Sequence, residues 1–140
     1  MPSSGPLERR EKWLRPLLEA MVPAARGLDR QALERVLRLS DAILLDRPAA
    51  IRHRAILAAN LIRSLVRLRC GPVSRQKAGC VAARLARLEN SRSRNIRLAL
   101  WATRTLLMAG YYGDPQRQKA ELGYRPQLRG WGGCREKTTP

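Results

Sequence analysis

The chain has 140 residues, enough for one domain with a sizeable core, but it contains no phenylalanine and only 4% aromatic residues. Leucine, alanine, isoleucine and valine must therefore fill the core, and no apolar run reaches the roughly 18 residues needed to span a bilayer. The net charge is +17, and residues 47–113 hold fourteen basic groups against one acid, so an acidic protein surface, nucleic acid or anionic lipid is expected to lie against them.

Two helices are expected before residue 47. The first opens near Pro6 and runs to about Val22, and Pro16 should kink or split it because proline has no backbone N–H to donate. Asp29 is a good N-cap for the second helix. The apolar face of that second helix carries Leu33, Val36, Leu37, Ser40 and Leu44.

A long third helix follows Pro48 and should end at Gly71, which precedes a proline. Its apolar arc is broad, which predicts a central helix in contact with more than one neighbour. The arc comprises Ile51, Ala55, Leu57, Ala58, Ala59, Leu61, Ile62, Leu65, Val66 and Leu68.

A fourth helix is expected after Ser74, which is a plausible N-cap, and its apolar face leaves Arg84 and Arg87 pointing away. That face carries Ala78, Val81, Ala82, Leu85 and Leu88.

Ser91 or Ser93 is expected to cap a fifth helix over residues 95–109. This helix has two apolar faces, and we expect both to be largely buried. One face carries Ile96, Leu100, Leu107 and Tyr111, and the other carries Leu98, Trp101, Thr105 and Met108.

Residues 110–115, which read GYYGDP, form the clearest turn signal in the chain. The fifth helix should stop at either glycine, since glycine can take the positive φ that ends a helix. The Asp-Pro pair can cap and open a short sixth helix, which Gly123 can end. Three tyrosines surround this double turn and either pin a helical hairpin or form part of a docking surface for another protein: Tyr111, Tyr112 and Tyr124.

The same segment carries a resemblance to a known family. Residues 106–115 (LLMAGYYGDP) and 120–124 (AELGY) resemble the C-terminal signature of the gluconate dehydrogenase small (gamma) subunit family, also described as subunit 3 of gluconate 2-dehydrogenase. Residues 85–93 (LARLENSRS) are similar to the helix and turn that precede this signature. Before residue 85 the likeness reduces to helical character and the run LLEAMVP at residues 17–23. The pattern is more specific than a lone glycine motif and less specific than a metal-ligand array.

The resemblance implies a small helical partner of a flavin-dependent oxidoreductase of the glucose–methanol–choline (GMC) type. In such systems the flavin and the catalytic residues belong to the large chain, and the small chain helps it to fold, mature or travel. The resemblance therefore implies FAD in the partner chain and no cofactor in this one. Similar helical segments also occur fused ahead of the flavin domain in some alcohol oxidases.

No catalytic constellation is apparent in the sequence. His53 is the only histidine, and neither a phosphate loop nor a dinucleotide fingerprint is present. The three cysteines are odd in number and lack CxxC spacing, so neither a disulfide framework nor a zinc site is indicated. We expect no metal, no catalytic residue and no enzyme activity in this chain alone, with free thiols at Cys70, Cys80 and Cys134.

The pair Arg9-Arg10 invites comparison with a twin-arginine export signal. Charged residues and Pro16 follow it, where such a signal needs an apolar stretch. The resembled family often carries an export signal, so this is a departure from its pattern. We expect a cytoplasmic protein, consistent with free thiols, or a periplasmic one that an exported partner carries.

The sequence thus predicts an all-α protein: a compact array of five to six helices over residues 1–124 and an irregular glycine-rich tail over residues 125–140, flexible or bound to a partner. Basic helices and the tyrosine turn are expected to bind the large flavoprotein chain, and Trp131 either packs onto the helices or inserts into that partner. The expected partner-binding residues are Arg84, Arg87, Arg94, Tyr111, Tyr112, Asp114, Tyr124 and Trp131.

Two other interpretations of the basic surface stay open. One is a merely solvated arginine-rich surface produced by composition bias. The other is a nucleic-acid-binding protein, in which arginines neutralise phosphates and make the affinity depend steeply on salt. The candidate phosphate contacts are Arg63, Arg67, Arg84, Arg87, Arg92, Arg94 and Arg97.

Overall fold

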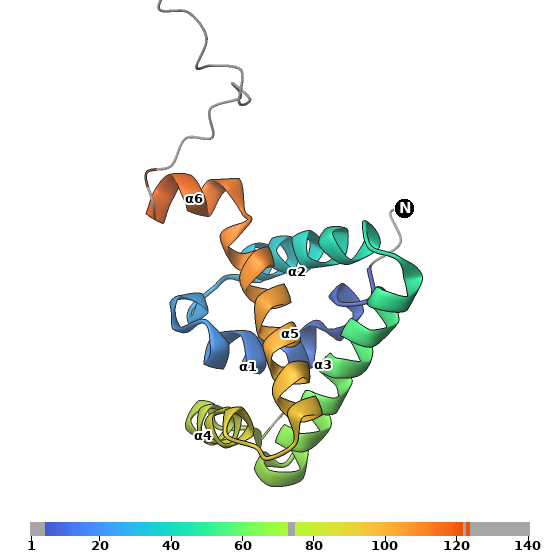
Figure 1. The fold of residues 1–140 in the computed structure, drawn as a ribbon. Coiled ribbons are helices and arrows are strands. Elements are labelled where there is room, and N and C mark those ends of the chain that lie inside the picture. Colours follow the sequence, from blue (N-terminus) through green and yellow to red (C-terminus); the bar gives the residue numbers. More distant parts are fainter. Residues whose placement is uncertain (1–4, 73–74, 122, 124–140) are drawn as a thin grey trace, which may run out of the picture.

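The computed structural model describes residues 5–72, 75–121 and 123, and in these residues the chain is all-α, as predicted (Figure 1). Two short 3-10 helices, η1 (Glu8–Arg10) and η2 (Pro23–Ala25), flank the first α-helix. The tail over residues 125–140 lies outside the described part, together with Ser74 and Tyr124. The α-helices are α1 (Glu11–Met21), α2 (Arg30–Leu45), α3 (Ala49–Cys70), α4 (Ala78–Glu89), α5 (Arg94–Tyr112) and α6 (Pro115–Glu121).

The helix at the centre of the array is α5. It packs extensively against both α2 and α3 and also contacts α1, α4 and α6. Figure 1 shows α5 in front, with α3 beside it and α4 near its N-terminal end. The sequence suggested that α3 would be central, and α3 does contact α2, α4 and α5. However, α3 buries only Ala59, Ile62 and Val66, whereas Ile51, Leu57, Leu61 and Leu68 are exposed.

The core is built from aliphatic side chains, as the lack of phenylalanine requires. Leucines of α1 and α2 supply much of it, because both helices place leucine at intervals of three and four residues and so form one continuous apolar stripe. Tyr111 is the largest side chain that is fully buried. The other fully buried residues include Leu7, Leu14, Leu18, Leu33, Leu37, Ile62 and Leu107.

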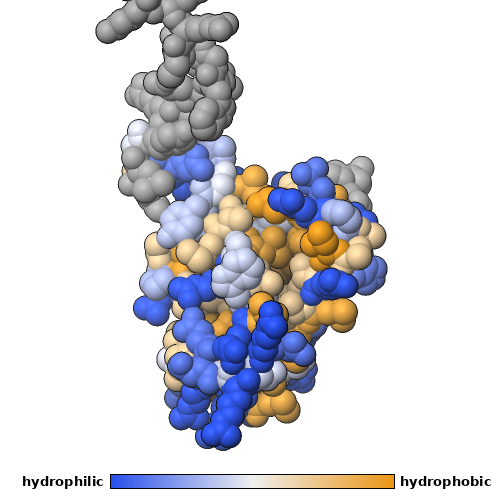
Figure 2. All heavy atoms as spheres, in the orientation of Figure 1, coloured by the Kyte–Doolittle hydropathy of each residue, from blue (hydrophilic) through white to orange (hydrophobic). Residues whose placement is uncertain are grey.

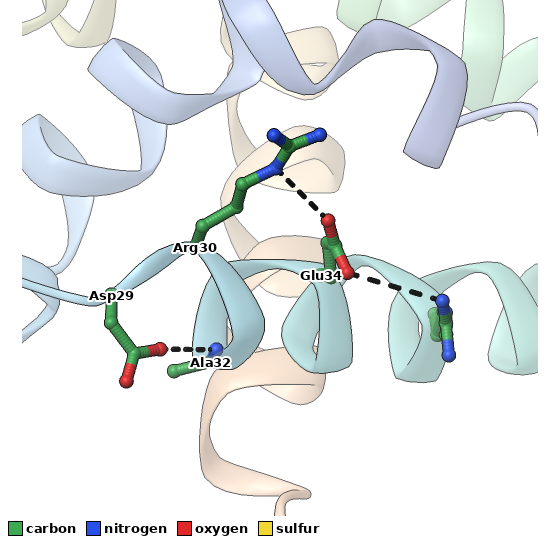
Figure 3. A network of polar contacts seen from close by, with 5 residues as sticks. Asp29, Arg30, Ala32 and Glu34 are labelled. Carbon is green, nitrogen blue, oxygen red and sulfur yellow. Dashed lines mark hydrogen bonds and ion pairs between the residues drawn. The ribbon is translucent and has the colours of Figure 1, made fainter.

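The start of α2 follows the predicted capping. The Oδ1 atom of Asp29 accepts a hydrogen bond from the backbone N–H of Ala32 at 2.6 Å, which satisfies a donor that the first helical turn leaves open (Figure 3). Farther along the same exposed face, Glu34 lies 3.2 Å from Arg30 and 4.0 Å from Arg38. Such exposed pairs within a helix contribute only a few tenths of a kcal/mol each.

A buried carboxylate fixes the segment that precedes α1. Asp41 of α2 accepts two hydrogen bonds from the backbone N–H of Leu7, at 2.9 Å and 3.2 Å from its two oxygens. Leu7 is itself fully buried. A charge-assisted bond to a backbone donor is stronger than a neutral one, so Asp41 holds this segment against α2.

Three helix boundaries differ in detail from those predicted from single residues. Pro16 lies inside α1 without splitting it. α4 begins at Ala78 with Lys77 in the N-cap position, later than a cap at residue 74 would give. α5 begins after Ser93, the predicted cap, but the Ser93 side chain makes no capping hydrogen bond.

The helix ends predicted at glycines are confirmed, but one of them does not use the predicted positive φ. Gly71 ends α3 with a φ of 75°, and Gly123 follows α6 with a φ of 60°. By contrast, α5 continues through Gly110 to Tyr112, and the residue at its C-cap, Gly113, has a φ of −75°. Neither glycine of the GYYGDP segment therefore ends α5 through a positive φ.

Gly110 serves instead as a contact point between α5 and α2. A methyl group built on Gly110 would lie 2.6 Å from the backbone oxygen of Val36 and would overlap the hydroxyl of Ser40. The Ser40 hydroxyl is buried there, 3.0 Å from the Val36 oxygen and 3.3 Å from the Leu106 oxygen of α5. The missing side chain thus allows two helix backbones to approach closely, with a serine between them.

Replacing Gly110 with alanine should destabilise the protein. The backbone oxygen of Val36 cannot move away without shifting α2, so overpacking of about 1–3 kcal/mol outweighs the gain of about 1 kcal/mol in helix propensity. The matched control is Gly79→Ala in α4, where an added methyl meets no atom within 4 Å and should leave stability equal or higher. Urea unfolding followed by circular dichroism measures both. An equal or higher urea midpoint for Gly110→Ala would contradict the close crossing.

The expectation of free thiols at Cys70 and Cys80 is wrong, because these residues form a disulfide. Their Cα atoms are 5.9 Å apart, within the range of disulfides. The bond joins the last residue of α3 to the first turn of α4, and both cysteines are half-buried rather than part of the core. Cys134 lies outside the described residues.

Replacing Cys80 with serine should lower the free energy of unfolding by about 2–3 kcal/mol, since the bond closes a short loop of the unfolded chain. Urea unfolding of the variant and of the oxidised and reduced wild type measures this loss. Tryptic peptides 70–75 and 78–84 should migrate as one cross-linked species in mass spectrometry and separate on reduction. Finding them separate in unreduced protein would contradict the pairing.

Candidate partner-binding surface

Tyr111 lies inside the molecule at 0% exposure. Its hydroxyl donates a hydrogen bond to the backbone oxygen of Ala24 in η2 at 3.0 Å and accepts one from Arg117 of α6 at 2.7 Å. The Arg117 guanidinium also lies over the tyrosine ring, 4.4 Å from its centroid. Tyr111, predicted to bind a partner, therefore joins η2, α5 and α6 within the described chain.

Asp114 completes this α5–α6 corner, by which we mean Ala24, Arg35, Tyr111, Asp114 and Arg117. Its side chain is only 3% exposed, and its Oδ1 atom accepts the backbone N–H of Gln116, which caps α6 as predicted. Its Oδ2 atom lies 3.6 Å from the Nε atom of Arg35 on α2. The carboxylate thus holds α6 to α2, and it is not accessible to a partner in this structure.

Tyr112 differs from Tyr111 because 40% of it is exposed. Its ring meets that of Tyr111 edge-to-face, with the centroids 5.0 Å apart and the planes at 84°. Of the predicted turn residues that the structure describes, Tyr112 alone presents an aromatic surface to solvent. Tyr124 and Trp131 lie outside the described residues.

The predicted basic residues do not form one cluster. Arg84 is half-buried on α4, and its Nε atom donates to the backbone oxygen of Leu65 on α3 at 3.2 Å. Arg84 and Arg87 line a hollow of about 160 Å³ together with Arg69, beside Cys80. Arg94 is exposed at the first position of α5 and belongs to a different hollow.

That second hollow, of about 420 Å³, lies between the end of α4 and the first half of α5. Arg104 lies at its edge and forms an ion pair of 2.8 Å with Glu89, the only acid of residues 47–113. The guanidinium of Arg97 donates to the backbone oxygen of Ser91. The residues that line this hollow are Glu89, Arg94, Arg97, Leu98, Leu100, Trp101 and Arg104.

The second apolar face of α5 is exposed, which corrects the expectation that both faces are buried. Trp101 is 66% exposed and Leu98 is 51% exposed, whereas Leu100 and Leu107 on the first face are buried. Figure 2 shows hydrophilic surface gathered over the lower part of this view, where α4 and the start of α5 lie, and hydrophobic surface on the side of α3. We call this face the α5 outer stripe: Leu98, Trp101, Thr105 and Tyr112, which are exposed, and Met108, which is partly buried against the core.

Sequence reasoning did not include most of this stripe among the site residues. Its spacing of three and four residues is visible in the sequence, but a buried helix face has the same spacing. What distinguishes the stripe is the arginine border formed by Arg94, Arg97 and Arg104. Three arginines beside an apolar row are the feature of the sequence that could have indicated an exposed face.

Other chemistry finds little support in the described part of the chain. His53 is exposed on α3, with its Nδ1 atom 3.3 Å from the backbone oxygen of Ala49. Among residues 5–72, 75–121 and 123, no group of three histidine, cysteine or acidic side chains is placed to hold a metal ion. Nor does any helix of these segments have the length and apolar character needed to cross a membrane.

Comparison with known proteins adds no relative. No family model, no curated protein and no solved structure matches this chain. The surface must therefore be interpreted from its own residues.

The two adjacent tyrosines should respond differently to loss of the hydroxyl group. Tyr111→Phe removes the bond to the Ala24 oxygen and the hydroxyl that accepts from Arg117, which should cost about 1–2 kcal/mol of unfolding free energy. Tyr112→Phe, the matched control, should change it by less than about 0.5 kcal/mol because its ring is partly exposed. Urea midpoints of the two variants measure the difference. Equal midpoints would show that the corner does not depend on Tyr111.

Proposed function

We propose that this chain is a non-catalytic accessory subunit or maturation helper of an FAD-dependent GMC-type oxidoreductase. The observation that carries the proposal is the α5 outer stripe, where a tryptophan and a leucine are exposed beside a row of arginines. The resemblance over residues 85–124 to the gluconate dehydrogenase small subunit family suggests which class of partner to test first.

A binding role is supported by the free energy that the α5 outer stripe loses by exposing apolar side chains to water. Leu98, Trp101 and Tyr112 expose large apolar surfaces on one face of α5, and such surfaces gain free energy when another surface covers them. Tryptophan and arginine are also the residues most often found at the energetic centre of protein interfaces. The charge of residues 47–113 adds a preference for an acidic partner, which reduces the repulsion among their arginines.

In the proposed complex the flavoprotein chain supplies FAD and the catalytic residues, and this chain supplies a preformed helical surface. The Cys70–Cys80 bond bears on where the complex resides. Disulfides persist in oxidising compartments, so the bond favours carriage by an exported partner over the cytoplasmic location that free thiols suggested.

Co-expression tests the proposal. The chain, with an affinity tag, is co-expressed with a GMC-type flavoprotein from the same genome and captured at low and at physiological salt. We expect the flavoprotein to elute with the tagged chain and to show flavin absorbance. Separate migration of the two chains at both salt concentrations would end the subunit hypothesis.

The nucleic-acid alternative gains no specific observation. Among its seven candidate phosphate contacts, Arg63 lies over the Trp13 ring at 5.1 Å, and Arg84 and Arg97 bond backbone oxygens. These contacts occupy part of the guanidinium groups that phosphates would need. A mobility shift with duplex and single-stranded probes at low salt is the direct test of this alternative.

A further inference from the structure

We propose that the α5 outer stripe binds an acidic amphipathic helix of the partner chain, with Trp101 as the main anchor. The inference rests on the proposed function for the partner's identity and specifies which surface holds it and what chemistry that surface recognises. It also moves the contact from the tyrosine turn to the middle of α5.

The shape of the stripe fits a helix. From Leu98 to Tyr112 its members alternate in steps of three and four residues, which is the spacing of a seam between two packed helices. At 1.5 Å per residue this seam is about 21 Å long, which corresponds to about four turns of a partner helix. An amphipathic helix would place its own i, i+3, i+4 and i+7 side chains along it.

The hollow beside the stripe supplies a receiving site. Its apolar wall is formed by Leu98, Leu100 and Trp101, and its volume of about 420 Å³ can accommodate a large apolar side chain. Trp101 belongs to this wall and is two-thirds exposed, so a partner side chain can cover much of its ring. Burial of tryptophan at the centre of an interface is the most frequent source of large binding energy.

The arginines select the charge of the partner. α5 contains no acidic residue, and Arg94, Arg97 and Arg104 border the hollow. Glu89 is the only carboxylate there, and its pair with Arg104 is about half exposed on both sides. Guanidinium groups bind carboxylates with two parallel hydrogen bonds, so glutamates flanking the apolar row of a partner helix would match this border.

A second copy of this chain is not expected to bind to the α5 outer stripe. It would bring the same arginines to the seam, and like charges across an interface cost several kcal/mol. The acidic helix is therefore the partner that both the apolar row and its border favour.

Peptide binding to the full chain tests the inference. The probe is a fluorescein-labelled 21-residue peptide with leucine at heptad positions a and d and glutamate at e and g. Two matched peptides carry lysine in place of glutamate, or the same residues in scrambled order. Fluorescence anisotropy should show that the acidic peptide binds at least tenfold more tightly than either, because binding needs both the charge and the apolar row.

Protein variants locate the contact. Trp101→Ala should weaken binding of the acidic peptide at least tenfold, and Trp101→Phe should recover most of it. Leu68→Ala, which removes an apolar side chain that is 82% exposed on α3, should change the affinity less than twofold. Circular dichroism confirms that each variant is folded. Equal binding by Trp101→Ala and wild type, or equal weakening by Leu68→Ala, would overturn the inference.

Capture of the flavoprotein by wild type and by Trp101→Ala distinguishes a failure of this inference from a failure of the proposed function. If Trp101→Ala captures the flavoprotein as well as wild type does, the subunit role stands and the stripe is not its contact. If the acidic peptide binds through Trp101 but the flavoprotein is never captured, the stripe stands and the flavoprotein assignment falls.

Discussion

The close crossing of α5 over α2 determines how the rest of the molecule is arranged. Gly110 meets the backbone of Val36 there, with the Ser40 hydroxyl between the two helices. One residue later Tyr111 reaches η2, and four residues later Asp114 reaches Arg35 on α2. A side chain at residue 110 would separate the helices, so the α5–α6 corner exists because that position has none.

This crossing also explains why the α5 outer stripe is exposed. Successive residues of a helix turn by about 100°, so directing Leu107 and Tyr111 into the core directs Trp101 and Tyr112 outward. Both α2 and α3 pack on the inner side of α5, which leaves its outer face uncovered within the described chain. The aromatic residues that the structure describes thus divide between core positions, Trp13 and Tyr111, and the outer face of α5, Trp101 and Tyr112.

The sequence predicted features that depend on neighbouring residues better than those that depend on distant ones. The Asp29 cap and the end of α3 at Gly71 are local, and both are confirmed. Gly110 and Gly113 were alternative ends of α5, and Gly113 is the C-cap. The role of Gly110 could not be predicted, because its contact lies about 70 residues away in α2 and sequence patterns do not show it. Counting cysteines likewise could not pair Cys70 with Cys80, since the pairing depends on how α3 and α4 meet. Of the predicted site residues that the structure describes, Arg87, Arg94 and Tyr112 are exposed. The sequence could not show which apolar face of α5 is buried, because both faces have helical spacing.

The arginines oppose folding through their mutual repulsion, and in the proposed complex the same charge would select an acidic partner. α3, α4 and α5 bring most of the charge of residues 47–113 into one half of the molecule, where repulsion disfavours compaction. Two contacts offset it locally: the disulfide holds α3 to α4, and Glu89 pairs with Arg104 of α5. An acidic helix on the α5 outer stripe would bring further carboxylates to the same arginines, so partner binding and stability of this half of the protein should be coupled.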